Sequence, residues 1–428
     1  MAHELLRFVE FYSGIGGMHF ALKECSFRCK VVAAMEINTT ANQVYQHNFG
    51  DTVLLQKNIE GLTTQEIDHL SADVFVMSPP CQPFTRVGLQ AASKDPRTKS
   101  FLHILELLPK LRRPPDYVLM ENVKGFETSD TRVHFLETLR QCGYTYQEFL
   151  LSPTQFGIPN SRLRYYLLAK RKPLQFCFST QDKIMDRIPH HSTNSTQDNL
   201  SRELYESCHH ICPPRMRGRA SDNEITNDVQ WSLTSVSKDC SNVKDEPNFS
   251  CVNCHQLRTV ENLNSEDTVK DYFSGNVKES RCGHISDYLE KDKPNEYFEE
   301  FLLSEKVLGK FALLLDIVTI HSERSCCFTK AYGHYAEGTG SVLKMIDIDD
   351  TEIFNKYRDL SDEKQKFQLL SVLKLRYFTP REVANLHGFP TEFCFPSSIS
   401  VKQRYRLLGN SLNVHVVSEL MNCLFQSP

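Results

Sequence analysis

The chain of 428 residues has no run of 18 or more apolar residues and no excess of basic charge. A bilayer-spanning helix needs about 20 apolar residues, so no membrane partner is expected. Residues Met1 to Glu4 also lack the basic and then apolar pattern of a signal peptide. The chain has 49 Lys and Arg residues and 53 Asp and Glu residues, so its net charge is −4. Any contact with nucleic acid must therefore come from local basic patches rather than from overall charge.

Cysteine, in contrast, is abundant, with 15 residues. An odd number in a chain without a secretion signal favours reduced thiols over a disulfide framework. We therefore expect a cytoplasmic location, with the nucleus as a second compartment. A composition of 40% hydrophobic and 24% charged residues is that of an ordinary globular protein, and the length allows two or three domains.

The N-terminal region begins with the pattern of a nucleotide-binding α/β unit. An apolar strand is predicted over Leu5 to Tyr12, then a glycine-rich turn over Ser13 to Gly17, then a helix. A second apolar run ends at Glu36, 19 residues beyond Gly17, which is the offset at which a carboxylate reaches ribose hydroxyls. No basic residue follows the glycines, so a cofactor with adenosine but no pyrophosphate fits better than a dinucleotide. A plain tight turn is the alternative interpretation.

A cysteine follows the next apolar strand, Val74 to Met77, on a turn that prolines make rigid. The turn reads Ser78-Pro79-Pro80-Cys81 and continues with another proline after Gln82. Proline restricts both its own backbone and that of the preceding residue, so the loop cannot easily fold over its own thiol. Cys81 is thus placed like a nucleophile, although a buried structural cysteine is the commoner case.

Charged residues follow the same pattern farther along the chain. Glu121 comes directly after an apolar strand over Tyr117 to Met120, where open α/β sheets bind their ligands. Arg162 and Arg164, two positions apart, share one face of an extended segment. A first-turn helix acid is the alternative for Glu121, and a solvated strand face is the alternative for the two arginines.

These motifs, in this order, resemble those of the cytosine-carbon-5 methyltransferases that use S-adenosylmethionine. The resemblance includes the C-terminal segment 403–411 and covers residues 1–180 and 300–428. Segments 327–332 and 337–341 are similar to a signature of one eukaryotic branch of that family. That branch has a DNA-methyltransferase architecture but methylates transfer RNA, at cytosine-38 of the aspartate tRNA.

The resemblance implies a set of site residues. The catalytic residues are Cys81, Glu121, Arg162 and Arg164, and the substrate-binding residues are Cys327, Phe328 and Thr329. The cofactor-binding residues, which would contact S-adenosylmethionine, are Phe11, Gly14, Ile15, Gly16, Gly17, Glu36, Ile37, Ile59, Glu60, Ser78, Asn410 and Ser411. No resident metal is expected.

The expected chemistry explains why these residue types are needed. Carbon 5 of cytosine is too electron-poor to attack a methyl sulfonium until a thiolate has added to carbon 6. Cys81 would supply that thiolate, helped by the cationic Arg162 or Arg164. Addition also requires a proton or hydrogen bond at N3, which Glu121 could donate if burial raises its pKa. The base that finally removes the carbon-5 proton is not identified by the sequence.

The predicted fold is α/β, a Rossmann-like S-adenosylmethionine-dependent methyltransferase fold with a mostly parallel, doubly wound sheet and a smaller inserted recognition region. Residues 1–173 would form the first part of the catalytic domain and 379–428 its C-terminal part, with target recognition over 174–378. Within that region, about 180–297 is polar and aperiodic, which predicts a disordered insertion. It contains cysteines and histidines at 251, 254, 255, 282 and 284, whose spacing is not that of a usual zinc site.

Methylation of cytosine in tRNA is the leading functional prediction, with cytosine-38 in the anticodon loop as target. The same motifs also serve DNA (cytosine-5-)-methyltransferases, so weak or primary action on DNA is the alternative. A nucleic-acid-binding protein that has lost activity and a dinucleotide oxidoreductase are further alternatives. Basic patches that could contact RNA are predicted at 110–113, 162–172 and 402–406. The oligomeric state is not predicted.

Overall fold

The structure is a computed structural model, and it describes residues 5–80, 98–189 and 282–427. Its larger sheet has the strand order β3-β2-β1-β4-β5-β7-β6. Strands β1 to β5 pair in parallel, whereas β7 is antiparallel to both β5 and β6. The strands are β1 (Leu6–Phe11), β2 (Cys29–Met35), β3 (Leu54–Leu55), β4 (Val74–Met77), β5 (Tyr117–Val123), β6 (Tyr144–Leu151) and β7 (Arg164–Arg171). The chain builds outward from β1 to β3 and then returns to place β4 on the other side of β1, so the carboxyl ends of β1 and β4 flank a switch point.

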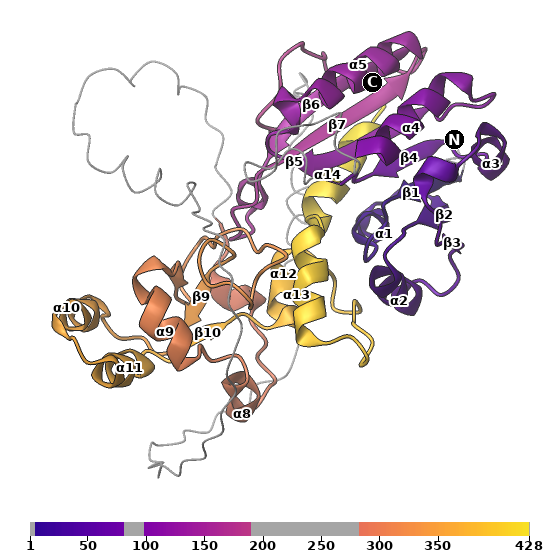
Figure 1. The fold of residues 1–428 in the computed structure, drawn as a ribbon. Helices are drawn as coiled ribbons and strands as arrows, with labels where there is room; N and C mark the ends of the chain where they lie inside the picture. The colour runs from indigo at the N-terminus through magenta and orange to yellow at the C-terminus, as the bar shows by residue number, and fades with distance from the viewer. Residues whose placement is uncertain (1–4, 81–97, 190–281, 428) are drawn as a thin grey trace, which may run out of the picture. The chain divides into compact units, whose positions relative to one another are not determined.

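Helices cover both faces of this sheet (Figure 1). Phe8 of β1 belongs to a core that it shares with α1 (Gly17–Glu24), α2 (Thr39–Asn48) and α14 (Val414–Phe425). Val9 and Phe11 face the opposite core, which is shared with α3 (Thr64–Leu70), α4 (Lys99–Leu107) and α5 (Asp130–Gln141). A strand that is buried on both faces needs a nearly continuous apolar sequence. The strands of this sheet could therefore be predicted from the apolar runs in the sequence.

The C-terminal end of the chain packs on the larger sheet, whose strands all come from the N-terminal part. The C-terminal helix α14, yellow in Figure 1, packs against α1 and β7. The ring centroids of Phe425 and Phe8 lie 5.8 Å apart, and the Lys170 ammonium donates to the Gln426 carbonyl at 3.1 Å. The C-terminal part therefore completes the core rather than forming a separate domain.

A smaller sheet with the order β10-β9-β8 has its own apolar core. The sequence has helical periodicity over Tyr297 to Ile320 and over Leu369 to Gly388, but each of these segments also contains a strand. The strands form because they pair with residues far away in the sequence, as Leu375 does with Lys344, and local periodicity cannot reveal such pairing. The elements of this half are α8 (Asn295–Glu299), α9 (Glu305–Phe311), β8 (Ile317–Val318), β9 (Val342–Lys344), α10 (Thr351–Asp359), α11 (Glu363–Ser371), β10 (Leu375–Tyr377), α12 (Pro380–Leu386) and α13 (Val401–Asn410).

Helix α12 begins where the sequence Thr379-Pro380-Arg381-Glu382 has a capping residue followed by proline. Thr379 accepts a hydrogen bond from the Glu382 amide at 3.1 Å, and the Glu382 carboxylate accepts from the Thr379 amide at 2.8 Å. This reciprocal capping box, with Pro380 in the first turn, satisfies amide groups that a helix start otherwise leaves without partners.

The predicted insertion, about 180–297, lies mostly outside the described residues. At its two described ends the chain is packed rather than loose. The Met185 amide donates to the Glu148 carbonyl at 2.9 Å, and Ile285 is fully buried. Within the described ranges, no helix has the length and apolar character needed to cross a membrane.

Candidate active site

The glycine-rich turn after β1 has a backbone that requires glycine. Gly14 and Gly16 have φ values of +53° and +86°, in the left-handed region that side chains disfavour. A Cβ atom at Gly16 would also collide with the Phe49 ring, and one at Gly17 would lie 2.9 Å from Leu412. The turn is thus held between α2 and the C-terminal segment.

Glu36 lies beside this turn. One of its carboxylate oxygens accepts from the Gly14 amide at 3.0 Å, and the other accepts from the Asn38 amide at 2.8 Å. The predicted pairing of glycine turn and carboxylate is therefore present in three dimensions. The next residue, Ile37, is 64% exposed, which leaves an apolar surface next to the carboxylate.

The other predicted cofactor residues approach the same edge of the sheet. The Ser78 hydroxyl donates to the Tyr12 carbonyl at 3.2 Å, which ties the end of β4 to the glycine turn. A Cβ atom at Gly17 would also lie 3.2 Å from the Ser411 hydroxyl, so the C-terminal segment lies against the turn. Phe11 and Ile59 are buried, whereas Glu60 and Asn410 are exposed. The turn, the carboxylate and the neighbouring hydroxyls suit an adenosine-containing cofactor.

Glu121 lies inside β5 rather than beyond its end, which corrects the predicted strand boundary. The strand continues because Glu121 pairs with Tyr166 and Val123 pairs with Arg164 of β7. Its side chain is almost fully buried, and its Oε1 lies 3.5 Å from the Arg164 Nε. Burial raises the pKa of Glu121, although Arg164 and Arg162 oppose that rise. A carboxyl group in this setting can retain a proton at a higher pH than an exposed one.

Both arginines converge on Cys327. The Arg162 Nη1 lies 3.2 Å from the Cys327 Sγ, and the Arg164 Nη2 lies 3.7 Å from it. Burial alone would raise the pKa of Cys327, but the two guanidinium groups outweigh burial and bring the pKa below its ordinary value. The sequence predicted Cys327 as a substrate contact; the structure shows in addition that its sulfur links the two arginines.

Arg162 makes further bonds that join distant segments. Its Nη1 donates to the Phe328 carbonyl at 3.1 Å, and its Nη2 donates to the carbonyls of Gly409, at 3.2 Å, and Ser411. Arg162 therefore anchors the active-site segments, whereas Arg164 pairs with Glu121. The Phe328 ring is buried against Tyr332 and Phe378, so only its backbone reaches the site. Thr329 bonds through its amide to the Thr339 carbonyl at 2.8 Å.

Cys81 lies outside the described residues. The chain just before it is tethered to β5, because the Asn122 amide group donates to the Pro79 carbonyl at 3.4 Å. Asn122, which is buried, was not predicted as a site residue, although it directly follows Glu121 in the sequence. Asn160 was missed as well; it is fully buried and donates to the Ser325 hydroxyl and the Cys326 carbonyl, each at 3.1 Å.

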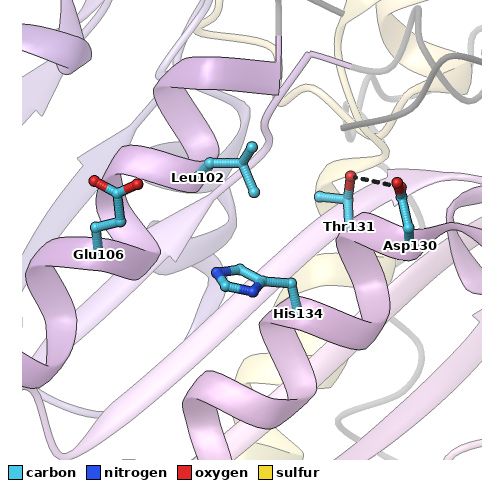
Figure 2. A pocket seen from close by; sticks show the side chains of 5 residues that line it. All are labelled: Leu102, Glu106, Asp130, Thr131 and His134. Atoms are coloured by element: carbon cyan, nitrogen blue, oxygen red, sulfur yellow. Dashed lines mark hydrogen bonds between the residues drawn. The ribbon is translucent and has the colours of Figure 1, made fainter. Parts of the chain in front are cut away.

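A separate groove of about 260 Å³ lies between α4 and α5. Figure 2 shows its lining, in which the Thr131 hydroxyl donates to Asp130 at 3.4 Å beside Leu102, Glu106 and His134. None of the predicted site residues lines this groove, so it is distinct from the candidate active site.

Of the potential zinc ligands, Cys282 and His284 are described and those at 251–255 are not. In the parts of the chain that the structure covers, no three His, Cys, Asp or Glu side chains are grouped to hold a metal ion.

The glycine turn beside Glu36, at the edge of a doubly wound sheet, defines an α/β protein of the kind that binds a nucleotide cofactor. Residues 6–426 match the family described as C-5 cytosine-specific DNA methylase, and the chain belongs to that family. The predicted family, fold and enzyme class are confirmed. Enzymes of this family use S-adenosylmethionine as methyl donor, which confirms the predicted cofactor.

Relatives align over the whole chain. A Mus musculus protein named tRNA (cytosine(38)-C(5))-methyltransferase is 47% identical and is aligned over 98% of this chain and 94% of its own length. A Dictyostelium discoideum protein named DNA (cytosine-5)-methyltransferase is 38% identical, over 98% and 94%. The crystal structure of a mutant Spodoptera frugiperda DNMT2 is similar with a TM-score of 0.70 and 37% identity, covering 98% of this chain and all of that one.

Proposed function

We propose that this protein transfers a methyl group from S-adenosylmethionine to carbon 5 of cytosine-38 in the anticodon loop of a tRNA, the aspartate tRNA being the expected substrate. The observation that carries the proposal is full-length similarity to a protein named for that tRNA position. The position of Cys327 between Arg162 and Arg164 supports it, because Cys327 belongs to the segment that resembles the tRNA-directed branch.

The described residues suit the proposed chemistry. S-adenosylmethionine supplies an electrophilic methyl group on a sulfonium. The Cys81 thiolate forms a bond to carbon 6, and Glu121 gives a proton to N3, so that carbon 5 becomes nucleophilic. After methylation a base, for which water is one candidate, takes the carbon-5 proton, the bond between Cys81 and carbon 6 breaks to release the thiolate, and the N3 proton returns to Glu121. The hydrogen bond from the Asn122 side chain to the Pro79 carbonyl supports these roles, because Pro79 precedes Cys81 by two residues and Asn122 directly follows Glu121 in β5.

Of the three basic patches predicted from the sequence, the one in α13 best suits contact with RNA near the site. Lys402, Arg406 and Asn410 are exposed and follow one another at four-residue spacing, which is one face of a helix. Gly409 packs against the backbone of Thr329 and Lys330, so this face borders the Cys327 segment. The Lys402 ammonium and the Arg406 guanidinium could bind the phosphates that flank a base extruded from the tRNA.

The other two patches lie elsewhere. Residues 110–113 precede the amino end of β5, and Lys170 pairs with Tyr117 at that same end. Glu121 stands near the opposite end of the strand. The first two arginines of the second patch, Arg162 and Arg164, are bonded within the active site.

Methyl transfer from labelled S-adenosylmethionine to total tRNA and to duplex DNA, measured side by side, tests the proposal. We expect incorporation into tRNA, and loss of it when cytosine-38 is replaced by uridine in an aspartate tRNA transcript. DNA methylation is the second candidate, because the Dictyostelium discoideum relative is named for it. Incorporation into DNA but not into tRNA would establish that alternative.

A further inference from the structure

A buried histidine lies outside every motif identified in the sequence. His387 directly follows α12 and is fully buried. Its Nδ1 lies 2.8 Å from the Val383 carbonyl, which can only accept, so Nδ1 carries the proton. In the neutral ring the Nε2 atom is then an acceptor, and it has no hydrogen-bond partner among the described residues. Such buried polar atoms are rare and require an explanation.

Arg162 has the complementary atom. Its two terminal nitrogens bond to the Cys327 sulfur and to backbone carbonyls, as described above. Its Nε is also buried, yet it has no partner within the described ranges. An N–H group that can only donate and a ring nitrogen that can only accept are therefore both buried and both without a partner.

Both residues border the same short segment, 409–414. Arg162 donates to the carbonyls of Gly409 and Ser411, while the His387 carbonyl accepts from the Val414 amide at 2.8 Å. The neighbouring Asn413 side chain donates to the Leu386 carbonyl at 3.1 Å. Burial and then the Arg162 charge, with a smaller contribution from Arg164, lower the pKa of His387 to about 3, so the ring is neutral at physiological pH.

We propose that His387 is a positioning residue for Arg162. One buried water accepts a hydrogen bond from the Arg162 Nε–H and donates one to the His387 Nε2, and so holds the guanidinium plane in the orientation that reaches Cys327 and Ser411. This water-mediated bond would hold the Arg162 guanidinium in place before the substrate binds. Supporting residues act in this way because groups that are already in place need to move less during the reaction. The kinetic part of the test rests on the proposed tRNA methylation, whereas the spectroscopic part does not.

The first measurement uses the unaltered protein. Long-range proton–nitrogen NMR of protein labelled with ¹⁵N-histidine should show His387 as the Nδ1-protonated tautomer, with an Nε2 signal shifted as for a hydrogen-bonded acceptor. The His387→Leu variant assigns the signal by its loss, or a selectively labelled sample does so if that variant fails to fold. An Nε2-protonated ring, or an Nε2 signal typical of an acceptor without a bond, would overturn the proposal.

The second measurement compares His387→Leu with His387→Gln, whose amide oxygen can still accept. We expect Leu to lower kcat about tenfold, the loss expected for one hydrogen bond to a charged group, with the KM for tRNA within about twofold. Gln should recover most of kcat, and His134→Leu, in the groove of Figure 2, is the control outside the site. If Leu and Gln are equally impaired, or if Leu has full kcat, His387 only fills space. Absence of methyl transfer by the unaltered enzyme would instead refute the proposed function and leave the NMR result to decide the role of His387.

Discussion

Arg162 and Cys327 are 165 positions apart in the sequence, yet the Arg162 Nη1 lies 3.2 Å from the Cys327 Sγ. The contact joins the segment just before β7 to the part of the chain that follows the predicted insertion. A buried cation and a sulfur whose pKa is lowered form a charge-assisted pair, and such pairs are stronger than neutral ones. The active site is thus assembled only when both halves of the chain are in place.

Glu36→Ala should weaken binding of S-adenosylmethionine by about 1.5–3 kcal/mol, the scale for hydrogen bonds to a charged group. The carboxylate also orders the glycine turn through the Gly14 amide, so part of the loss would come from that turn. Calorimetric titration checks the prediction, with Glu137→Gln on α5 as the control. Unchanged affinity would mean that the ribose is held by other groups.

Glu121→Gln should lower kcat by about 100-fold or more, because an amide cannot donate the proton that N3 requires. The tRNA KM should change little, since the amide keeps the shape of the side chain. Single-turnover methyl transfer with the two proteins measures this effect. A large rise in KM at constant kcat would show that Glu121 only binds the base.

Stability should fall as pH rises between about 5 and 8, because of Glu10. Burial raises the pKa of Glu10 from 4.5 to about 8, opposed by a hydrogen bond from Tyr45 and reinforced by Glu36. In that window the unfolded chain has released a proton that the folded protein keeps, so the free energy of unfolding decreases by up to about 1.4 kcal/mol per pH unit. The stabilisation that the folded protein gains by keeping Glu10 protonated is fully present below pH 4.5. It is lost as the pH rises through about 8.

Urea unfolding of the protein and of Glu10→Gln over this pH range checks the sign. The amide cannot ionise, so the variant should lose stability less steeply as pH rises, whereas Glu137→Gln should match the unaltered protein. Parallel curves for Glu10→Gln and the unaltered protein would show that Glu10 is ionised in the fold.

Reversing charge on α13 should weaken tRNA binding. We expect the double variant Lys402→Glu with Arg406→Glu to raise the tRNA Kd. The slope of the logarithm of the binding constant against the logarithm of salt concentration should also fall by about one for each lost phosphate contact. The matched control is Lys110→Glu with Arg112→Glu, at the amino end of β5, where both side chains are exposed. Equal effects of the two double variants would count against a specific RNA face on α13.

Much of the sheet could be predicted from sequence because its strands are buried on both faces. Val74 to Met77 is an uninterrupted apolar run, and the structure has β4 over the same four residues. The end of β5 could not be predicted in this way. Glu121 continues the strand only because β7 pairs beside it, and no local pattern reports such pairing.

The parts of the site that depend on local geometry could be predicted, and the parts that depend on tertiary packing could not. Motif spacing located Glu36 and the glycine turn, since both follow from the local geometry of a strand and a turn. Spacing could not show that the Phe328 ring belongs to the core, or that the basic residues at 110–113 lie at the far end of the strands. Whether a side chain faces a site or a core depends on tertiary packing. The unpartnered nitrogen of His387 likewise becomes visible only when the surrounding segments are assembled.

The most direct test of the central claim is the covalent trap at Cys81. A tRNA carrying 5-fluorocytosine at position 38 should be methylated once and then remain bonded to the protein, because fluorine cannot leave carbon 5 as a proton does. Intact mass spectrometry should show one protein–tRNA adduct in the presence of S-adenosylmethionine, and Cys81→Ala should abolish it while still binding the cofactor. An adduct that persists in Cys81→Ala, or methylation of ordinary tRNA with no trapped adduct, would contradict the account.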